Sequence, residues 1–226
     1  MFQQSPADFY LYSSRYDDWL RGRGQLSEQE LRGLAIFNDP RKGNCASCHP
    51  SQMRSGARPQ FTDYGYAALA VPRNAAIPAN ADPRFFDLGL CGPQRKDLSD
   101  HPEYCGMFKV PTLRNVAVRR EFFHNGKFSD LETSVQFYAQ RNTAPERWYT
   151  RSRRTAGTFD DLPTALQANV NREPPFGLTR GEKPPIGDEE IADVIAFLRT
   201  LTDADATVVP AATKGGPRAR RRRPLE

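Results

Sequence analysis

The sequence has no stretch of about 18 consecutive apolar residues, the length that a helix needs to cross a bilayer. Its first residues also lack the order of a basic start, an apolar stretch and a small-residue cleavage site that marks a secretory signal. Cysteine and histidine are scarce, with four and three copies in 226 residues. These absences exclude a transmembrane segment in the sequence and make any cluster of cysteine and histidine informative.

An excess of positive charge is missing from most of the chain. The formal net charge is +5, but residues 208–226 carry six basic side chains against one acidic side chain, so residues 1–207 sum to zero. A stretch rich in Pro, Gly and Ala followed by an arginine run is typical of a solvated tail. We therefore expect no nucleic-acid partner and interpret residues 205–226 as a disordered basic tail. Docking of that tail on an acidic partner or a membrane surface is the alternative.

Signals for β-strands are weak, and the predicted fold class is all-α. Capping signals and apolar residues at helical spacing predict helices at 6–21, 27–39, 129–140 and 188–201, with a short helical piece after Pro111. The two capping boxes are Ser27-x-x-Glu30 and Ser129-x-x-Glu132. Residues 50–111 are rich in Pro, Gly, Asn and Asp and indicate a long irregular segment, which needs a function or an internal support.

The stretch "NCASCHP" at residues 44–50 places two cysteines and one histidine within five positions. Cys-x-x-Cys-His is the spacing of c-type haem attachment, in which Cys45 and Cys48 hold the haem by thioether bonds and His49 supplies an axial nitrogen to iron. A redox dithiol or half of a zinc site would share this spacing, but a zinc ribbon needs a second close pair. The other two cysteines stand fourteen positions apart, which favours one covalent haem c.

Covalent haem attachment also indicates the compartment, because in bacteria it is completed outside the cytoplasm. The periplasm is oxidising, so Cys91 and Cys105 are expected to form a disulfide. For a loop of about 15 residues this bond contributes roughly 3 kcal/mol in the chain-entropy model, and it would support the irregular segment. The alternative is a pair of free, buried thiols.

The sixth ligand of the haem iron is not determined by residue types alone. Methionine or histidine commonly completes a cytochrome haem, and the candidates are Met53, Met107, His101 and His124. Met53 follows His49 too closely to reach the opposite haem face, and His101 lies in a polar loop. Met107 has a suitable chain separation, although a methionine beside phenylalanine also suits core packing.

Five stretches, taken in their order and spacing, resemble the bacterial dihaem cytochrome c peroxidase family, which includes MauG. They are "LSEQELRGLAIFND", "GNCASCH", "FKVPTLRNVA", "FFHNGKFSDLETSVQFY" and "DEEIADVIAFLRTLT". The resemblance spans about residues 26–202, matches the C-terminal haem domain and implies a cytochrome c-like helical domain with long irregular loops. In that family an N-terminal haem splits hydrogen peroxide, and the C-terminal haem receives electrons and passes them across.

The resemblance implies roles for individual residues. Cys45, Cys48 and His49 match the attachment motif of the C-terminal haem, and His124 matches a histidine close to that haem. Typical peroxidases of the family carry a distal methionine ligand fourteen positions after that histidine. Tyr138 stands there in this sequence, as in MauG, and is the expected iron ligand. An anionic tyrosinate would stabilise ferric over ferrous iron relative to methionine, with Met107 left open as the alternative ligand.

Two weaker implications concern the haem edge and a metal ion. Arg114 in "PTLRN" is placed to pair with a haem propionate through a bidentate contact. The family holds a calcium ion between its two domains, partly through a Thr-x-Pro before the motif histidine. Arg119 and Glu121 stand at those positions here, and a further ligand would come from the other domain, so bound calcium is not predicted.

The chain is expected to have three parts. Residues 1–25 would be a remnant or linker of an upstream haem domain, residues 26–204 the haem domain and residues 205–226 the tail. The haem would be wedged between the 27–39, 130–140 and 188–201 helices. Gly33 and Phe37, one turn apart, would let the first of these helices cross closely against the last.

We therefore expect periplasmic electron transfer through one covalent haem c, in the C-terminal half of a peroxidase-like or MauG-like oxidoreductase whose peroxidatic domain is not in this chain. The electron partner would be that second haem domain or a small redox protein, and a homodimer is left open. The alternatives are a stand-alone monohaem electron carrier, which binds no peroxide, and a non-haem dithiol or metal domain, which would be colourless.

Overall fold

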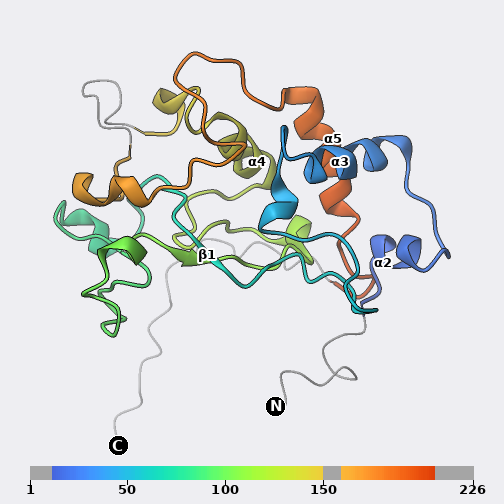
Figure 1. Ribbon diagram of the computed structural model, residues 1–226, viewed down its shortest axis with the longest axis horizontal. Helices are drawn as coiled ribbons and strands as arrows, with labels where there is room; N and C mark the ends of the chain where they lie inside the picture. The colour runs from blue at the N-terminus through green and yellow to red at the C-terminus, as the bar shows by residue number, and fades with distance from the viewer. Residues whose placement is uncertain (1–11, 150–158, 207–226) are drawn as a thin grey trace, which may run out of the picture.

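The computed structural model describes residues 12–149 and 159–206, and these residues are mostly helical where they are regular. The α-helices are α2 (Arg15–Leu20), α3 (Glu28–Asn38), α4 (Leu131–Gln140) and α5 (Asp188–Arg199), and short 3₁₀ turns join them (Figure 1). No helix in the described ranges is long and apolar enough to cross a bilayer. Nearly all of the predicted basic tail and residues 6–11 of the predicted first helix lie outside the described residues.

Helix starts follow local capping chemistry, and two of them differ from the sequence-based prediction. Ser27 caps α3 in the predicted capping box with Glu30. Helix α2 begins at Arg15 with Ser14 as its N-cap, so the described part of the predicted 6–21 helix starts later than expected. Helix α4 is capped by Asp130, whose carboxylate accepts from the Thr133 amide, and the predicted Ser129 capping box is wrong by one residue.

Helices α3 and α5 cross closely, as predicted, because α3 carries a glycine at the crossing point. A Cβ atom on Gly33 would overlap the backbone carbonyl oxygen of Asp193 and lie 2.6 Å from its carbonyl carbon. Phe37 is buried one turn later, and its ring centroid lies 5.2 Å from that of Phe197. The rings of Tyr16 and Phe61 complete this aromatic core, which joins α2 and the irregular segment to the α3–α5 pair.

A short pair of strands makes the fold predominantly helical rather than strictly all-α. Strands β1 (Tyr66–Ala67) and β2 (Phe108–Lys109) pair antiparallel, with Tyr66 opposite Lys109. Each has two residues, so sequence periodicity gave no signal for them. The short helical piece expected after Pro111 is a 3₁₀ turn that starts later, at Val116–Val118.

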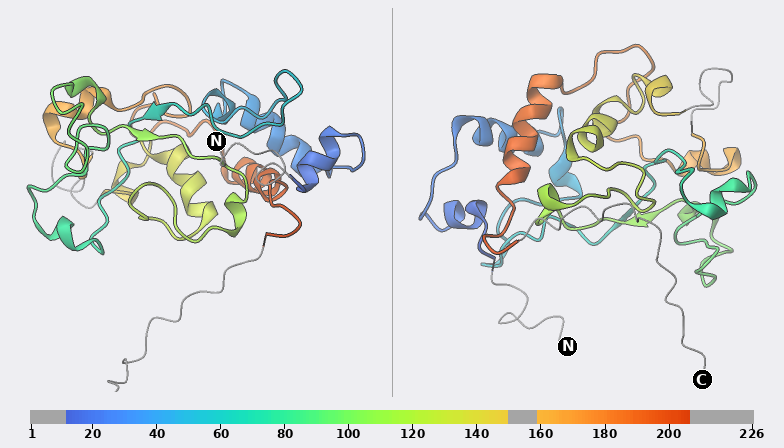
Figure 2. Two further views of the ribbon diagram at one scale, coloured as in Figure 1. Left: turned by 90° about the horizontal axis from the view of Figure 1, so that it is seen from below. Right: turned by 180° about the vertical axis from the view of Figure 1, so that it is seen from behind.

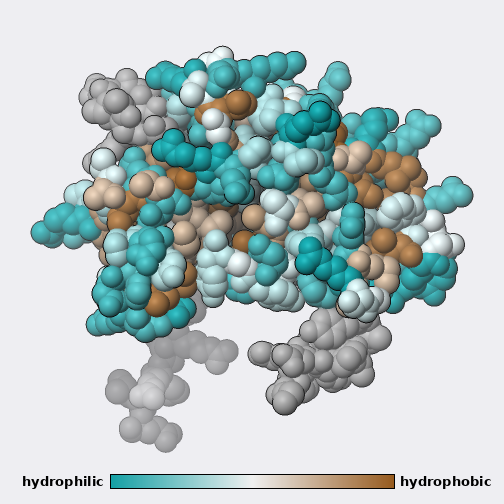
Figure 3. All heavy atoms as spheres, in the orientation of Figure 1, coloured by the Kyte–Doolittle hydropathy of each residue, from teal (hydrophilic) through white to brown (hydrophobic). Residues whose placement is uncertain are grey.

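The segment 50–111 is irregular, as predicted, and the expected disulfide between Cys91 and Cys105 is present. Both views in Figure 2 place the region around this disulfide at the opposite end of the molecule from α2. On the face shown in Figure 3, hydrophilic residues cover much of the surface, and hydrophobic patches emerge between them. The disulfide therefore supports a lobe that has almost no regular secondary structure.

Candidate functional site

A cavity of about 360 Å³ opens between the three longer helices and the irregular segment. Its volume lies in the range of small-molecule sites, and its wall is mostly apolar. Phe37 of α3, Val135 and Tyr138 of α4, and Val194 and Leu198 of α5 contribute to that wall. The three helices predicted to enclose a haem therefore do enclose a cavity.

Two free cysteines lie on one wall of this cavity. Cys45 and Cys48 flank a 3₁₀ turn, Cys45–Ser47, which presents both side chains to the cavity. Burial raises the pKa of the Cys45 thiol to about 12 and also raises the pKa of Cys48. Asn44 opens the turn with a positive φ of 48°, a conformation that asparagine tolerates better than most residues. The arrangement suits two thioether bonds to one edge of a planar group.

His49 follows directly and also lines the cavity. Its Nδ1 atom lies 2.7 Å from the backbone carbonyl oxygen of Phe61. Because a carbonyl only accepts hydrogen bonds, Nδ1 carries the proton and Nε2 keeps a free lone pair for a metal. Burial lowers the pKa of His49, so the imidazole is neutral, which is the form that ligates iron.

Tyr138 lies in the cavity wall on α4, and aromatic rings pack on both sides of it. The centroid of its ring is 5.6 Å from that of Phe123 and 5.5 Å from that of Phe176. Burial raises the pKa of the Tyr138 phenol well above its usual range, so the protein alone holds it neutral. Ionisation at neutral pH would need an additional cation such as a bound metal.

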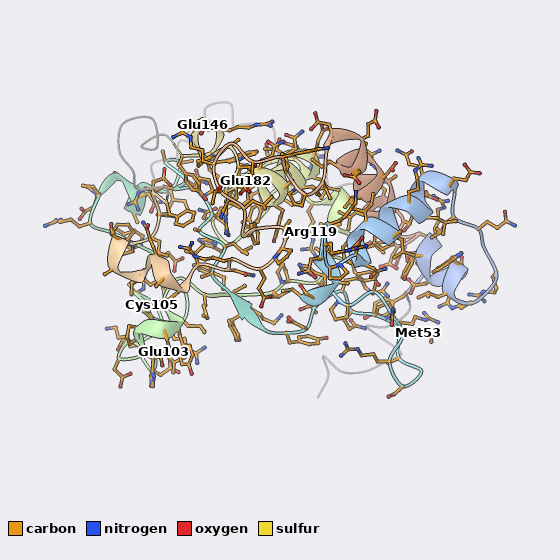
Figure 4. The ribbon with its side chains drawn as sticks, turned by 45° about the horizontal axis from the view of Figure 1, so that its top comes forward. Met53, Glu103, Cys105, Arg119, Glu146 and Glu182 are labelled. Atoms are coloured by element: carbon orange, nitrogen blue, oxygen red, sulfur yellow. A yellow bond between two sulfur atoms is a disulfide. The ribbon has the colours of Figure 1, made fainter. Side chains whose placement is uncertain are left out.

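The other candidate ligands occupy different positions. His124 lines the cavity and stacks on Phe108, with ring centroids 3.5 Å apart. Met107 is not among the described residues that line the cavity. Met53 is 46% exposed, at the opposite end of Figure 4 from the disulfide lobe, and His101 is at the surface beside Glu103. Tyr138 and His124 thus share the cavity with the attachment motif, and the other three do not.

Arg114 lies outside the cavity wall, contrary to the expected contact with a propionate. Its guanidinium forms a buried bidentate ion pair with Asp17, at 2.8 and 3.0 Å, and also donates to the carbonyl of Pro59. All of its donor directions toward protein are used by these oxygens, because Asp17 is fully buried beneath it. Arg119 does line the cavity, near the middle of Figure 4, and burial lowers its pKa.

Three contributors to this site were not predicted from the sequence. Phe61 acts through its backbone carbonyl, which any residue type would provide. Phe176 and the fully buried Arg141 come from chain segments without a recognisable motif. Their positions depend on long-range packing, so only the structure identifies them.

The residues present fit a covalently attached haem. Two unpaired cysteines, a histidine with a fixed tautomer and an apolar cavity lie together, which is the donor set that such a group requires. Fold and site together define a c-type haem domain.

Comparisons with known proteins agree with that class. MauG of Paracoccus denitrificans is 30% identical over 203 residues, which span 88% of this chain and 49% of MauG. Cytochrome c551 peroxidase of Nitrosomonas europaea is 24% identical over 212 residues, spanning 91% and 45% respectively. The crystal structure of the dihaem peroxidase BthA from Burkholderia thailandensis is 45% identical with a TM-score of 0.78, covering 86% of this chain and 47% of that one.

The chain belongs to the family of bacterial dihaem cytochrome c peroxidases and MauG. It spans about half the length of the curated relatives it matches. No protein-family model matches the sequence.

Proposed function

We propose that the chain transfers electrons through one covalent haem c, as the C-terminal half of a dihaem peroxidase-like or MauG-like oxidoreductase. Cys45 and Cys48 would attach the haem, and His49 and Tyr138 would ligate its iron from opposite faces. The haem supplies one-electron redox chemistry when bound. The observation that carries the proposal is the cavity wall that joins Cys45, Cys48 and the hydrogen-bonded His49 to Tyr138 of α4.

The protein's own groups have defined tasks in this proposal. Phe61 holds the proton of His49 at Nδ1 and thereby fixes the ring orientation. The apolar wall excludes water, which strengthens electrostatic interactions at the iron. An anionic oxygen from Tyr138 favours the ferric state and a low reduction potential relative to methionine. Such a site suits the sharing of oxidising equivalents with a partner haem, and is a poor acceptor from ordinary cytochromes.

Two further parts of the proposal concern the haem edge and the compartment. His124 packs on Phe108 at the cavity and would flank the haem, and Arg119 would replace Arg114 as the cation near a propionate. A disulfide and a covalent haem both require oxidising conditions, which supports a periplasmic location. The electron partner would be a second haem domain or a small redox protein.

The test uses the full chain matured with a c-type haem apparatus. With both axial positions filled, the chain should exchange single electrons with a mediator but should oxidise a reduced cytochrome with hydrogen peroxide only weakly. Tyr138→Phe, which frees one axial position, should react with peroxide faster than the wild type. Robust, saturable peroxidase turnover by the wild-type chain at neutral pH would contradict the proposal.

A further inference from the structure

Arg141 is a fully buried cation without an anionic partner. It follows the last turn of α4 and has no exposed surface. Its Nε donates to the side-chain oxygen of Asn142, and its two Nη atoms donate to the backbone carbonyls of Leu69 and Asn171, at 3.1 and 2.5 Å. None of the ion pairs among residues 12–149 and 159–206 includes it.

Burying a charge is costly unless an opposite charge compensates it, so this position calls for an anion. The three acceptors of Arg141 are neutral oxygens, which satisfy its hydrogen bonds and leave its charge uncompensated. Burial accordingly lowers the pKa of Arg141 to about 10, and the guanidinium is still protonated at neutral pH. The missing anion must therefore belong to a state of the site other than the bare protein.

The geometry connects Arg141 with Tyr138. The guanidinium carbon lies 3.7 Å from the centroid of the Phe176 ring, and that ring packs on Tyr138 at 5.5 Å with an interplanar angle of 31°. Arg141 is not among the described residues that line the cavity, whereas Phe176 and Tyr138 are. Its charge therefore acts from behind the wall, through an aromatic layer of low polarizability to water, and not by contact with a bound group.

The other ionisable groups near Arg141 do not supply the anion. Tyr149 donates its phenolic proton to the backbone carbonyl of Ala70 at 2.7 Å, and burial raises its pKa far above neutrality. Arg172 carries the same sign of charge and adds repulsion. Tyr138 is thus the phenol that is placed both to receive this field and to become anionic at the site.

We propose that Arg141 is a positioning residue whose buried charge compensates the phenolate of Tyr138 when that oxygen ligates iron. The inference rests on the proposed function, because it requires Tyr138 to be an iron ligand. A nearby cation favours the ionised form of an acid, so loss of the Arg141 charge should favour release of the ligand as the neutral phenol.

An isosteric change next to Arg141 tests this without removing its side chain. Asn142→Asp converts the amide oxygen that accepts from Nε into a carboxylate, which neutralises the guanidinium and keeps the shape of the contact. In the haem-loaded chain it should raise the pH at which ferric iron turns high-spin by about one unit, a tenfold change in proton affinity. Arg141→Gln should act in the same direction, and Arg141→Lys, which keeps the charge, should stay close to wild type.

The matched control is Gln140→Glu, which makes the same amide-to-carboxylate change beside the exposed Arg147. It should leave the ferric transition unchanged, because solvent screens that pair. Thermal unfolding of each variant shows whether the fold is intact. Wild-type behaviour of Asn142→Asp, or equal shifts in Arg141→Lys and Arg141→Gln, would overturn the role of the charge.

A separate variant distinguishes failure of this inference from failure of the proposed function. If Tyr138→Phe leaves the ferric spectrum unchanged, Tyr138 is not a ligand and the ligation itself is wrong. If Tyr138→Phe turns the iron high-spin while Asn142→Asp does not move the transition, only the role of Arg141 is wrong. In the double variant Tyr138→Phe with Asn142→Asp, the second change should have no further effect on the spectrum.

Discussion

Among single residues, Phe61 has no signal in the sequence, yet its carbonyl determines which nitrogen of His49 is free to bind a metal. It accepts from Nδ1 while its backbone adopts a positive φ of 50°, which is uncommon for an aromatic residue. Its ring packs in the aromatic core with Tyr16 and Phe37. The core therefore holds this backbone conformation, and the conformation orients the imidazole.

Tyr138 gives the most specific prediction at this scale. Tyr138→Phe removes the anionic oxygen, so ferric iron in the matured chain should become five-coordinate or bind water and turn high-spin. Met107→Leu is the control and should change little, because Met107 does not line the cavity among the described residues. The ferric absorption and electron paramagnetic resonance spectra check this. A methionine-to-iron charge-transfer band that disappears only on changing Met107 would contradict it.

The buried pair of Asp17 and Arg114 gives a prediction for pH. Burial alone would raise the pKa of Asp17, but hydrogen bonds from Arg114 and Ser14 outweigh it, and the pKa lies below its usual value. A depressed folded-state pKa contributes stability above the unfolded-state pKa, and this contribution is lost as the pH falls through the folded-state pKa. Asp17→Asn should cost about 3–5 kcal/mol at neutral pH, because it leaves Arg114 unpaired.

Urea unfolding at neutral and acidic pH measures this effect. The stability difference between wild type and Asp17→Asn should shrink in acid, where the wild-type carboxylate is also protonated. A difference that is constant with pH would show that the ion pair does not contribute in this way.

The candidate site was predictable from the sequence only where the chemistry is local. Cys45, Cys48 and His49 are adjacent, and Tyr138 lies at a fixed spacing from His124 on a family pattern, so sequence alone suggested them. Arg114 was misplaced because its partner, Asp17, lies 97 positions away in the chain. Neither that pair nor the packing of Arg141 on Phe176 leaves a local pattern.

At the scale of elements, the helices were predictable because capping and periodicity are local signals. The box of Ser27 and Glu30 and the apolar face of α5 appear as expected. The start of α4 moved by one residue because Asp130 competes with Ser129 for the N-cap, and a carboxylate also interacts favourably with the helix dipole. The two-residue strands were not predictable, since their pairing depends on the arrangement of the irregular segment.

The α3–α5 crossing gives a prediction in which two effects oppose each other. Alanine has a higher helix propensity than glycine by about 1 kcal/mol, so Gly33→Ala would stabilise an isolated helix. In the protein its methyl group would overlap the Asp193 backbone, and overpacking costs about 1–3 kcal/mol. We expect net destabilisation in chemical denaturation, accompanied by a perturbed haem spectrum because Phe37 and Val194 line the cavity.

The control for this change is Gly187→Ser at the N-cap of α5. A Cβ atom there meets no atom within 4 Å, and serine is a preferred N-cap residue. It should be neutral or slightly stabilising. A Gly33→Ala protein as stable as wild type would mean that the two helices do not need this close approach.

At the scale of the whole molecule, the α3–α5 pair and α4 form one side of the cavity, and a disulfide-supported irregular segment forms much of the other. The disulfide joins Cys91 to Cys105, and Gly106 and Phe108, just after it, line the cavity. The Gly89 backbone forms bridges to Cys105 and Met107, which fixes the path of this loop. A haem that bridges both sides would replace the hydrophobic core that so irregular a segment lacks.

The central claim is that this cavity holds one haem attached through Cys45 and Cys48. Intact-mass measurement of the chain matured with a c-type haem apparatus, after acid-acetone extraction, tests it most directly. We predict the mass of the polypeptide plus a single haem, a labile single-thioether haem in either Cys→Ser variant, and no retained haem in the double variant. A mature chain without added mass, or a double variant that still carries covalent haem, would contradict the account.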